Sequence, residues 1–151
     1  NITMSIFDKW NSNVDLVGLQ KDIKDAQNNN KEFEKVPYGE YEVKVDKIEL
    51  KATKKGDPMV SIWFTILNGK YKKCKLFMNQ VITQGFQIHI VNNLLKSMGT
   101  DLNIEFIDYK QYADLLLDVA EECDANNLEF ALKYEDNKGY DKFTITEVFE
   151  G

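Results

Sequence analysis

Two large aromatic residues and several lysines alternate with apolar residues in the stretch 36–82. Trp63 falls between the apolar positions of one predicted strand and Phe77 between those of the next, so both point away from the core. Lys73 and Lys75 precede Phe77 on the same side of its strand. Aromatic rings stack on any nucleobase for roughly 1–3 kcal/mol per base, and lysines contact phosphates. These residue types at this spacing favour a surface that binds single-stranded nucleic acid.

Further candidate residues fall at the ends and turns of the predicted strands. The full nucleic-acid-binding set is Trp63, Phe77, Lys73, Lys75, Lys54, Lys55, Asn79, Lys138 and Tyr140. No residue of this set is placed to read base edges, so we expect little sequence preference. Three alternatives stay open: an N-terminal arm (1–35) or an acidic helix (109–123) covers Trp63 or Phe77, the lysines serve solubility or edge protection, or Tyr140 is a packing residue.

The strands that carry this set are predicted from apolar residues at every second position. Turn signals separate three strands, at residues 54–58 and at Asn68-Gly69. The apolar phase of the first strand shifts in its middle, which predicts a β-bulge near Asp46-Lys47. The core-facing residues expected from the second and third strands are Val60, Ile62, Phe64, Ile66, Cys74, Leu76 and Met78.

Two helices and a hairpin are predicted after the third strand. The first helix begins at a Thr83 cap and stops at Gly99, and the second runs from an Asp108 cap to Asn126-Asn127. The hairpin turns at Asn137-Lys138-Gly139. The second helix has an apolar stripe of Tyr112, Leu115, Leu116, Val119 and Cys123, and an acidic face of Asp114, Asp118, Glu121 and Glu122.

This order of elements predicts a mainly β fold with helices. Three strands, a helical crossover and two more strands are typical of the five-stranded OB-like Greek-key barrel. We assign the barrel to residues 36–151, with an acidic helical insertion at 100–127 between strands 3 and 4. An N-terminal arm with a short helix precedes it at residues 1–35, of which the first three, before a candidate start at Met4, are a candidate cloning remnant.

Charge is unevenly distributed along the chain, although the net charge is −6. Residues 44–75 hold nine lysines and three acidic residues, a local charge of +6. Residues 101–150 hold four lysines and fourteen acidic residues, a local charge of −10. Phosphate contacts need cations, so the three predicted strands are the expected binding surface. The acidic helix has three interpretations: a solvated face, a contact for a partner protein, or a nucleic-acid mimic that shields the basic strands.

Enzymatic chemistry finds little support in the residue pattern. Cys74 and Cys123 lack metal-ligand spacing, His89 is the single histidine, and no glycine-rich phosphate loop occurs. We therefore expect no enzyme activity, no metal and no cofactor. No apolar run approaches the roughly 20 residues of a membrane span, and no leader is evident, so we expect a cytoplasmic protein without membrane contact.

Three stretches resemble the phage-encoded single-stranded DNA-binding proteins of the replication and recombination modules of phages of low-GC Gram-positive bacteria. The stretches are VPYGEYEV at 36–43, KKGDPM at 54–59 leading into Ile62-Trp63-Phe64, and NQVITQGF at 79–86. The resemblance covers most of the chain outside residues 101–127. It implies an OB-like barrel that coats single-stranded DNA in the host cytoplasm, with phage or host replication and recombination proteins as further partners. It supplies no binding residues of its own.

The predicted function is therefore sequence-nonspecific binding of single-stranded DNA in phage replication or recombination. The alternative is a non-catalytic protein-interaction adaptor, built on the same barrel and acting through the acidic helix. Either protein could oligomerise.

Overall fold

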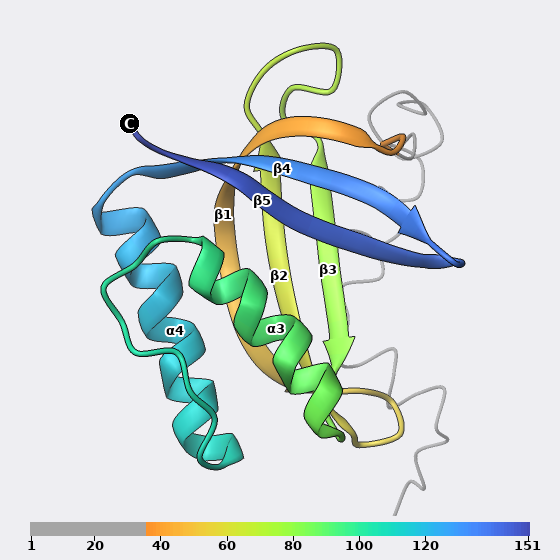
Figure 1. The fold of residues 1–151 in the computed structure, drawn as a ribbon, viewed down its shortest axis with the longest axis vertical. Helices are drawn as coiled ribbons and strands as arrows, with labels where there is room; N and C mark the ends of the chain where they lie inside the picture. The colour runs from red at the N-terminus through yellow and green to blue at the C-terminus, as the bar shows by residue number, and fades with distance from the viewer. Residues whose placement is uncertain (1–35) are drawn as a thin grey trace, which may run out of the picture. The chain divides into compact units, whose positions relative to one another are not determined.

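The structure, a computed structural model, describes residues 36–151, so the predicted N-terminal arm lies outside the described residues. Five antiparallel strands form one sheet, and two helices connect the third strand to the fourth (Figure 1). The elements are β1 (Gly39–Ala52), β2 (Pro58–Ile66), β3 (Lys75–Val81), α3 (Gly85–Ser97), α4 (Tyr109–Ala125), β4 (Leu128–Asn137) and β5 (Tyr140–Glu150). The strand order across the sheet is β3-β2-β1-β4-β5. The predicted strand and helix order is confirmed.

Strand β1 belongs to both halves of the sheet because a bulge bends it. Its residues 39–43 pair with β4, and its residues 43–52 pair with β2. The register with β2 shifts between Val45 and Lys47, which leaves Asp46 as the extra residue. The bulge predicted at this place is confirmed.

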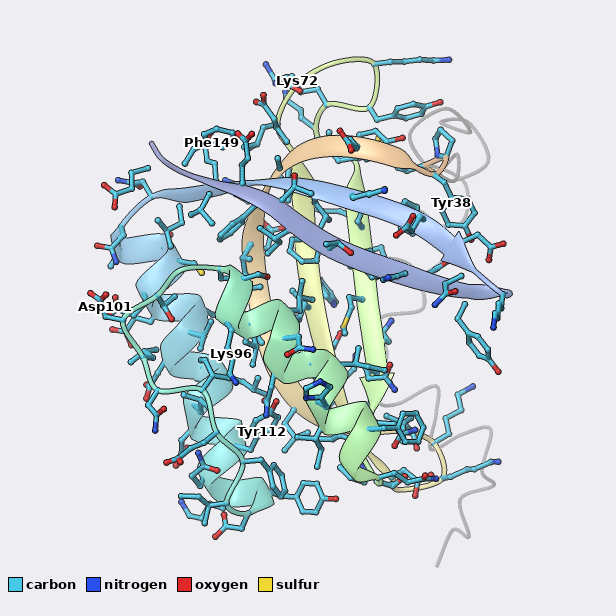
Figure 2. All side chains as sticks on the ribbon, in the orientation of Figure 1. Tyr38, Lys72, Lys96, Asp101, Tyr112 and Phe149 are labelled. Carbon is cyan, nitrogen blue, oxygen red and sulfur yellow. The ribbon has the colours of Figure 1, made fainter. Side chains whose placement is uncertain are left out.

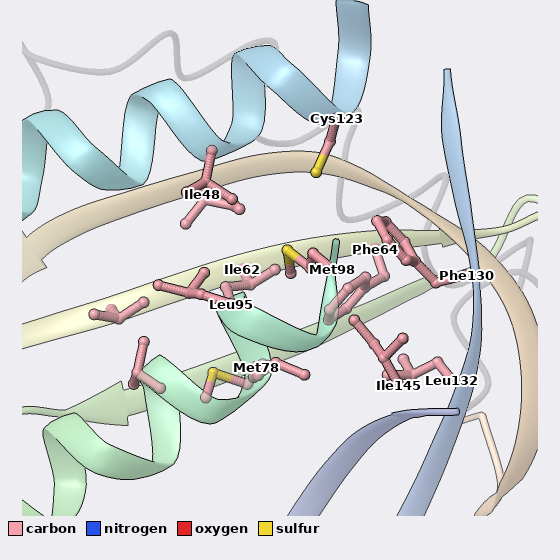
Figure 3. Close-up of a cluster of buried hydrophobic side chains, with 14 of the residues drawn as sticks. Ile48, Ile62, Phe64, Met78, Leu95, Met98, Cys123, Phe130, Leu132 and Ile145 are labelled. Atoms are coloured by element: carbon pink, nitrogen blue, oxygen red, sulfur yellow. The ribbon is translucent and has the colours of Figure 1, made fainter. Parts of the chain in front are cut away.

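The core lies between one face of the sheet and the two helices (Figure 3). Ile62 and Phe64 of β2 are fully buried, and α4 buries its whole predicted stripe. The buried residues that α3 contributes are Val91, Leu94 and Leu95, with Met98 at its C-terminal end. Cys74 was expected in this core but is only half-buried, because it lies in the loop before β3 rather than on the strand.

The helix ends follow local hydrogen bonds. Asp108 Oδ1 accepts a bond from the Gln111 N–H at 2.8 Å, which confirms the predicted N-cap of α4. The Thr83 cap is wrong by one residue, since the N-cap of α3 is Gln84. There the Gln87 side chain accepts the backbone N–H of Gln84 at 3.0 Å. Helix α3 stops before Gly99 as predicted, and this glycine has a φ of +72°.

The sheet is open in the part of the chain that the structure describes, with β3 and β5 as its two edges. A fully closed barrel has no such edges, and the OB-like barrel predicted from the sequence is not confirmed by this open sheet. The hairpin of β4 and β5 nevertheless crosses over the β1–β3 strands (Figure 1). Phe143 of β5 stacks on Phe64 of β2, with ring centroids 6.2 Å apart. The two ends of the sheet therefore share one core.

Candidate nucleic-acid interface

Strands β1, β2 and β3 present a polar and aromatic surface on the side opposite the core. Residues paired directly across antiparallel strands point to the same side, so the register defines the rows of this surface. From β1 through β2 to β3 the rows are Lys44–Thr65–Lys75, Lys47–Trp63–Phe77 and Glu49–Ser61–Asn79. We name these nine residues, together with the bulged Asp46, the outer face. The predicted residues Trp63, Phe77, Lys75 and Asn79 all lie on it.

Hydrogen bonds to the neighbouring row fix the orientation of Trp63. The indole Nε1–H donates to Ser61 Oγ at 3.2 Å, and the Ser61 hydroxyl donates to Asn79 Oδ1 at 2.8 Å. Ser61 is completely buried, and no other polar or charged residue in the described part of the chain is classed as buried. Asn79, predicted as a ligand contact, therefore also supports the indole from β3.

Both neighbours in its row contact the Trp63 ring. Lys47 Nζ lies 4.3 Å from the ring centroid, in cation–π geometry. The Phe77 ring meets the indole edge to face, with centroids 5.3 Å apart and planes at 89°. Trp63 is half-buried as a result, whereas Phe77 keeps 49% of its surface exposed. Phe77 is thus the ring that a base can reach directly, and Lys47 must move before a base stacks on the face it covers.

Two lysines of the outer face are ion-paired within the protein. Lys75 Nζ lies 2.7 Å from Asp46 Oδ2, and it also donates to the Thr65 hydroxyl. Lys47 Nζ lies 3.2 Å from Glu49 Oε1. Carboxylates of β1 therefore balance the charges of Lys47 and Lys75, while Lys44 makes no ion pair within the described residues.

The two ends of β2 carry lysines with a different environment. Lys54 and Lys55 lie in the turn between β1 and β2, and a positive φ of 88° at Gly56 shapes that turn. Figure 2 labels Lys72 on the β2–β3 loop, at the other end of the sheet. The lysines of these two turns are Lys54, Lys55, Lys70, Lys72 and Lys73, which we name the end lysines. All five are exposed, and none makes an ion pair within residues 36–151.

Lys73 does not lie where the sequence placed it. Its φ is +74°, and its backbone N–H donates to the Ile66 carbonyl at 2.8 Å, which closes the β2–β3 loop. Strand β3 begins two residues later, at Lys75. The expectation that Lys73 flanks Phe77 along the strand is therefore wrong.

Lys138 and Tyr140 belong to the tip of the β4–β5 hairpin. The turn forms where it was predicted, with positive φ values of 54° at Lys138 and 89° at Gly139. Tyr140 is 78% exposed, so it is not a packing residue within the described part of the chain. Within residues 36–151, no hydrogen bond, ion pair or ring contact joins these two residues to the outer face.

A family model described as "Protein of unknown function (DUF669)" matches residues 23–147. The chain belongs to this family. The matched range contains every residue of the outer face and all the end lysines. The comparison with curated proteins finds no match. DUF669 is described without an activity, so the function of this DUF669 chain has to be argued from its geometry, and the phage DNA-binding resemblance stays a prediction.

The predicted set omits six residues of the outer face of this DUF669 chain, and for two of them, Lys47 and Glu49, the sequence carries a signal. The six are Lys44, Asp46, Lys47, Glu49, Ser61 and Thr65. The phase shift at the bulge turns Ile48 inward, and its neighbours Lys47 and Glu49 must then point outward. Asp46 is the bulged residue itself. Its contact with β3 depends on the fold and has no local signal.

The acidic helix lies on the other side of the sheet. Helix α4 packs its apolar stripe against the core face of β1, so it does not cover the outer face. Asp114, Asp118 and Glu121 are exposed, and Leu117 among them is 57% exposed. Within residues 36–151, no helix is long and apolar enough to span a membrane, and no cluster of side chains is suited to a metal ion.

Proposed function

We propose that this DUF669 protein binds single-stranded DNA without sequence preference, and that it acts in phage DNA replication or recombination in the host cytoplasm. The observation that carries the proposal is the exposed Phe77 ring beside Trp63, at the centre of a surface with lysine clusters at both ends. A base stacks on such a ring whatever its identity, and lysines neutralise the flanking phosphates.

The dimensions of the outer face suit a short single strand. The nine residues of β2 extend roughly 30 Å at about 3.3 Å per residue, and end lysines lie beyond each end. A site of about 4–16 nucleotides is usual for one OB fold. A strand that follows β2 would bring its phosphates to Lys54 and Lys55 at one end and to Lys72 at the other.

We further assign the fold to the OB class, as an OB barrel that is open between β3 and β5. The strand order, the bulged β1 and the contact between Phe64 and Phe143 support this assignment. OB folds bind ligands over strands 2 and 3 and with the loops after strands 1 and 4. Lys138 and Tyr140 occupy the second of those loops and would contact the strand from there.

Anisotropy titration of a labelled oligo-dT tests the proposal, at two salt concentrations and with duplex DNA for comparison. Phe77→Ala should weaken dT binding about 5- to 160-fold, because one stacked base contributes about 1–3 kcal/mol. Phe86→Ala is the matched control, since Phe86 is 60% exposed on α3 and is not part of the outer face. Absence of salt-sensitive dT binding, or equal affinities of the two variants, would contradict the proposal.

One observation favours a second candidate function, a protein-interaction adaptor. Leu117 is an exposed apolar side chain among the carboxylates of α4, on the side of the sheet away from the outer face. A partner with a basic, partly apolar surface would complement it. Failure to bind dT at low salt, combined with a co-purifying protein that is lost on Leu117→Asp, would favour the adaptor.

A further inference from the structure

The centre and the ends of the DNA-binding surface differ in how their lysines are held. At the centre, Lys75 and Lys47 each contact a carboxylate of β1, at 2.7 Å and 3.2 Å. Their side chains are 45% and 41% exposed, so phosphates can reach them. The five end lysines have no carboxylate partner within the described residues. An incoming strand thus meets lysines without an ion pair at the ends, whereas two of the three outer-face lysines are ion-paired and only Lys44 is not, within the described residues.

The Lys75 pair spans three strands and depends on the bulge. Asp46 is the inserted residue of β1, and Lys75 begins β3, on the far side of β2. Thr65 of β2 lies between them, where its hydroxyl donates to Asp46 Oδ2 and accepts from Lys75 Nζ. Without the extra residue, β1 would not offer a carboxylate between the Lys44 and Lys47 rows. The Asp46–Lys75 ion pair therefore depends on the β-bulge in β1.

The Lys47 pair controls access to an aromatic ring. Glu49 holds the Lys47 side chain two residues along the same face of β1, and the ammonium lies over the Trp63 ring. A base that stacks on this face of the indole must displace the ammonium. The displaced ammonium can then bind a phosphate, but it has to leave Glu49 to do so.

We propose that Asp46 and Glu49 are internal competitors of the DNA phosphates, which set the affinity of the outer face for single-stranded DNA. Each carboxylate occupies a lysine that a phosphate would otherwise bind, and binding at the centre exchanges one anion for the other. This inference rests on the proposed function. It distinguishes Asp46 and Glu49 from carboxylates without an outer-face lysine partner, such as Glu135, whose effect on DNA binding would come through net charge.

Neutral, isosteric variants test the exchange by dT titration. Asp46→Asn and Glu49→Gln should each tighten binding about 2- to 5-fold, the range expected for loss of an exposed ion pair. The matched control is Glu135→Gln, because Glu135 is paired with Lys133 at 3.7 Å on an outward position of β4. It changes the net charge equally and should alter affinity less than 2-fold.

A double-mutant cycle distinguishes direct competition between Asp46 and the phosphate for Lys75 from a general effect of removing one negative charge. In a Lys75→Gln background, Asp46→Asn should change the affinity for dT no more than Glu135→Gln does. Glu49→Gln should still tighten dT binding in this background as much as it does in the wild-type protein. Thermal melting first establishes that each variant is folded, and Asp46→Ser replaces Asp46→Asn if the latter is not.

The titrations distinguish failure of the competitor role from failure of the proposed function. If wild-type protein binds dT and Phe77→Ala weakens it, but Asp46→Asn and Glu49→Gln match Glu135→Gln, the competitor role is overturned and the proposed function stands. If wild-type protein and every variant fail to bind dT at low salt, both fall together.

Discussion

Alternate residues of β2 point to the two faces of the sheet, and these faces have different environments. The comparison separates the residues that stabilise the fold from those that are available to a ligand. On the inner face, Val60, Ile62 and Phe64 are completely buried against the helices and the hairpin. On the outer face, Trp63 is half-buried and contacts side chains of β1 and β3. The inner face needs only apolar side chains of suitable volume, whereas the outer contacts, apart from the Lys47–Glu49 pair within β1, need a particular partner on another strand.

The two faces also differ in what their residues contribute. Burial of the inner side chains provides folding free energy, at about 25 cal/mol per Å² of apolar surface. The outer ion pairs are exposed and contribute little to stability, typically below about 1 kcal/mol each. Conservative changes to the outer face should therefore alter ligand binding without unfolding the protein. Changes to the inner face should mainly lower the free energy of unfolding.

The largest expected effect comes from the same substitution made on each face. Phe64→Ala should lower the free energy of unfolding by about 3–5 kcal/mol, because it leaves a cavity in the core. Phe77→Ala should lower it by less than about 1 kcal/mol, since half of that ring is already in water. Urea denaturation of both variants measures the difference, and equal losses would contradict the division between the faces.

A smaller effect is expected at the one place where the outer face is buried. Ser61→Ala removes the acceptor for the Trp63 indole and the donor to Asn79, and should cost about 1–2 kcal/mol in the free energy of unfolding. Thr146→Ala serves as control, because that exposed hydroxyl makes one hydrogen bond of 3.3 Å, to the Ala131 carbonyl. Denaturation midpoints of the two variants provide the test. A midpoint unchanged by Ser61→Ala would mean that the hydrogen bonds from Trp63 to Ser61 and from Ser61 to Asn79 do not order the indole.

Lys47→Met should change stability by less than about 1 kcal/mol, because the cation–π contact and the ion pair it removes are both partly exposed. Its effect should instead appear in the emission of Trp63, from which the ammonium is removed. Comparison with Lys133→Met, which breaks an ion pair of β4 that does not involve Trp63, isolates that change. Identical spectra for the two variants would argue against the Lys47–Trp63 contact in solution.

The pH dependence of the free energy of unfolding should reflect the burial of Cys123 and Tyr112 of α4 in the core. Burial, with a smaller contribution from the Glu122 charge, raises the pKa of the Cys123 thiol to about 11 from 9.0. Burial also raises the pKa of Tyr112. The unfolded chain therefore loses protons at lower pH than the folded one, so stability is fully present below pH 9 and falls as the pH rises toward 11. Urea midpoints between these values should decrease, and a constant midpoint would contradict the burial of these groups.

The sequence predicts those features that depend on local period. The α4 stripe, its Asp108 cap and the Asp46 bulge follow from spacing along one segment, and all three are confirmed. The start of β3 was placed too early because the lysine-rich loop continues the alternation of the strand, which misplaced Lys73 and Cys74.

Features that depend on strand register could not be predicted in the same way. The contact of Lys75 with Asp46 joins residues on two strands that do not pair with each other. Barrel closure likewise depends on whether β3 and β5 meet, which no local pattern encodes. The strand alternation therefore predicted that Trp63 and Phe77 point outward from adjacent strands, but the candidate set omitted the carboxylates of Asp46 and Glu49 beside them.

Fluorescence of Trp63 tests most directly whether the outer face binds single-stranded DNA. The chain contains two tryptophans, so a Trp10→Phe variant leaves Trp63 as the sole reporter. Titration with oligo-dT at low salt should quench its emission in a saturable way, reversed by added salt, and a duplex of equal length should quench it much less. Emission that stays unchanged while dT is bound would place the site elsewhere, and the absence of any dT binding would contradict the proposed function.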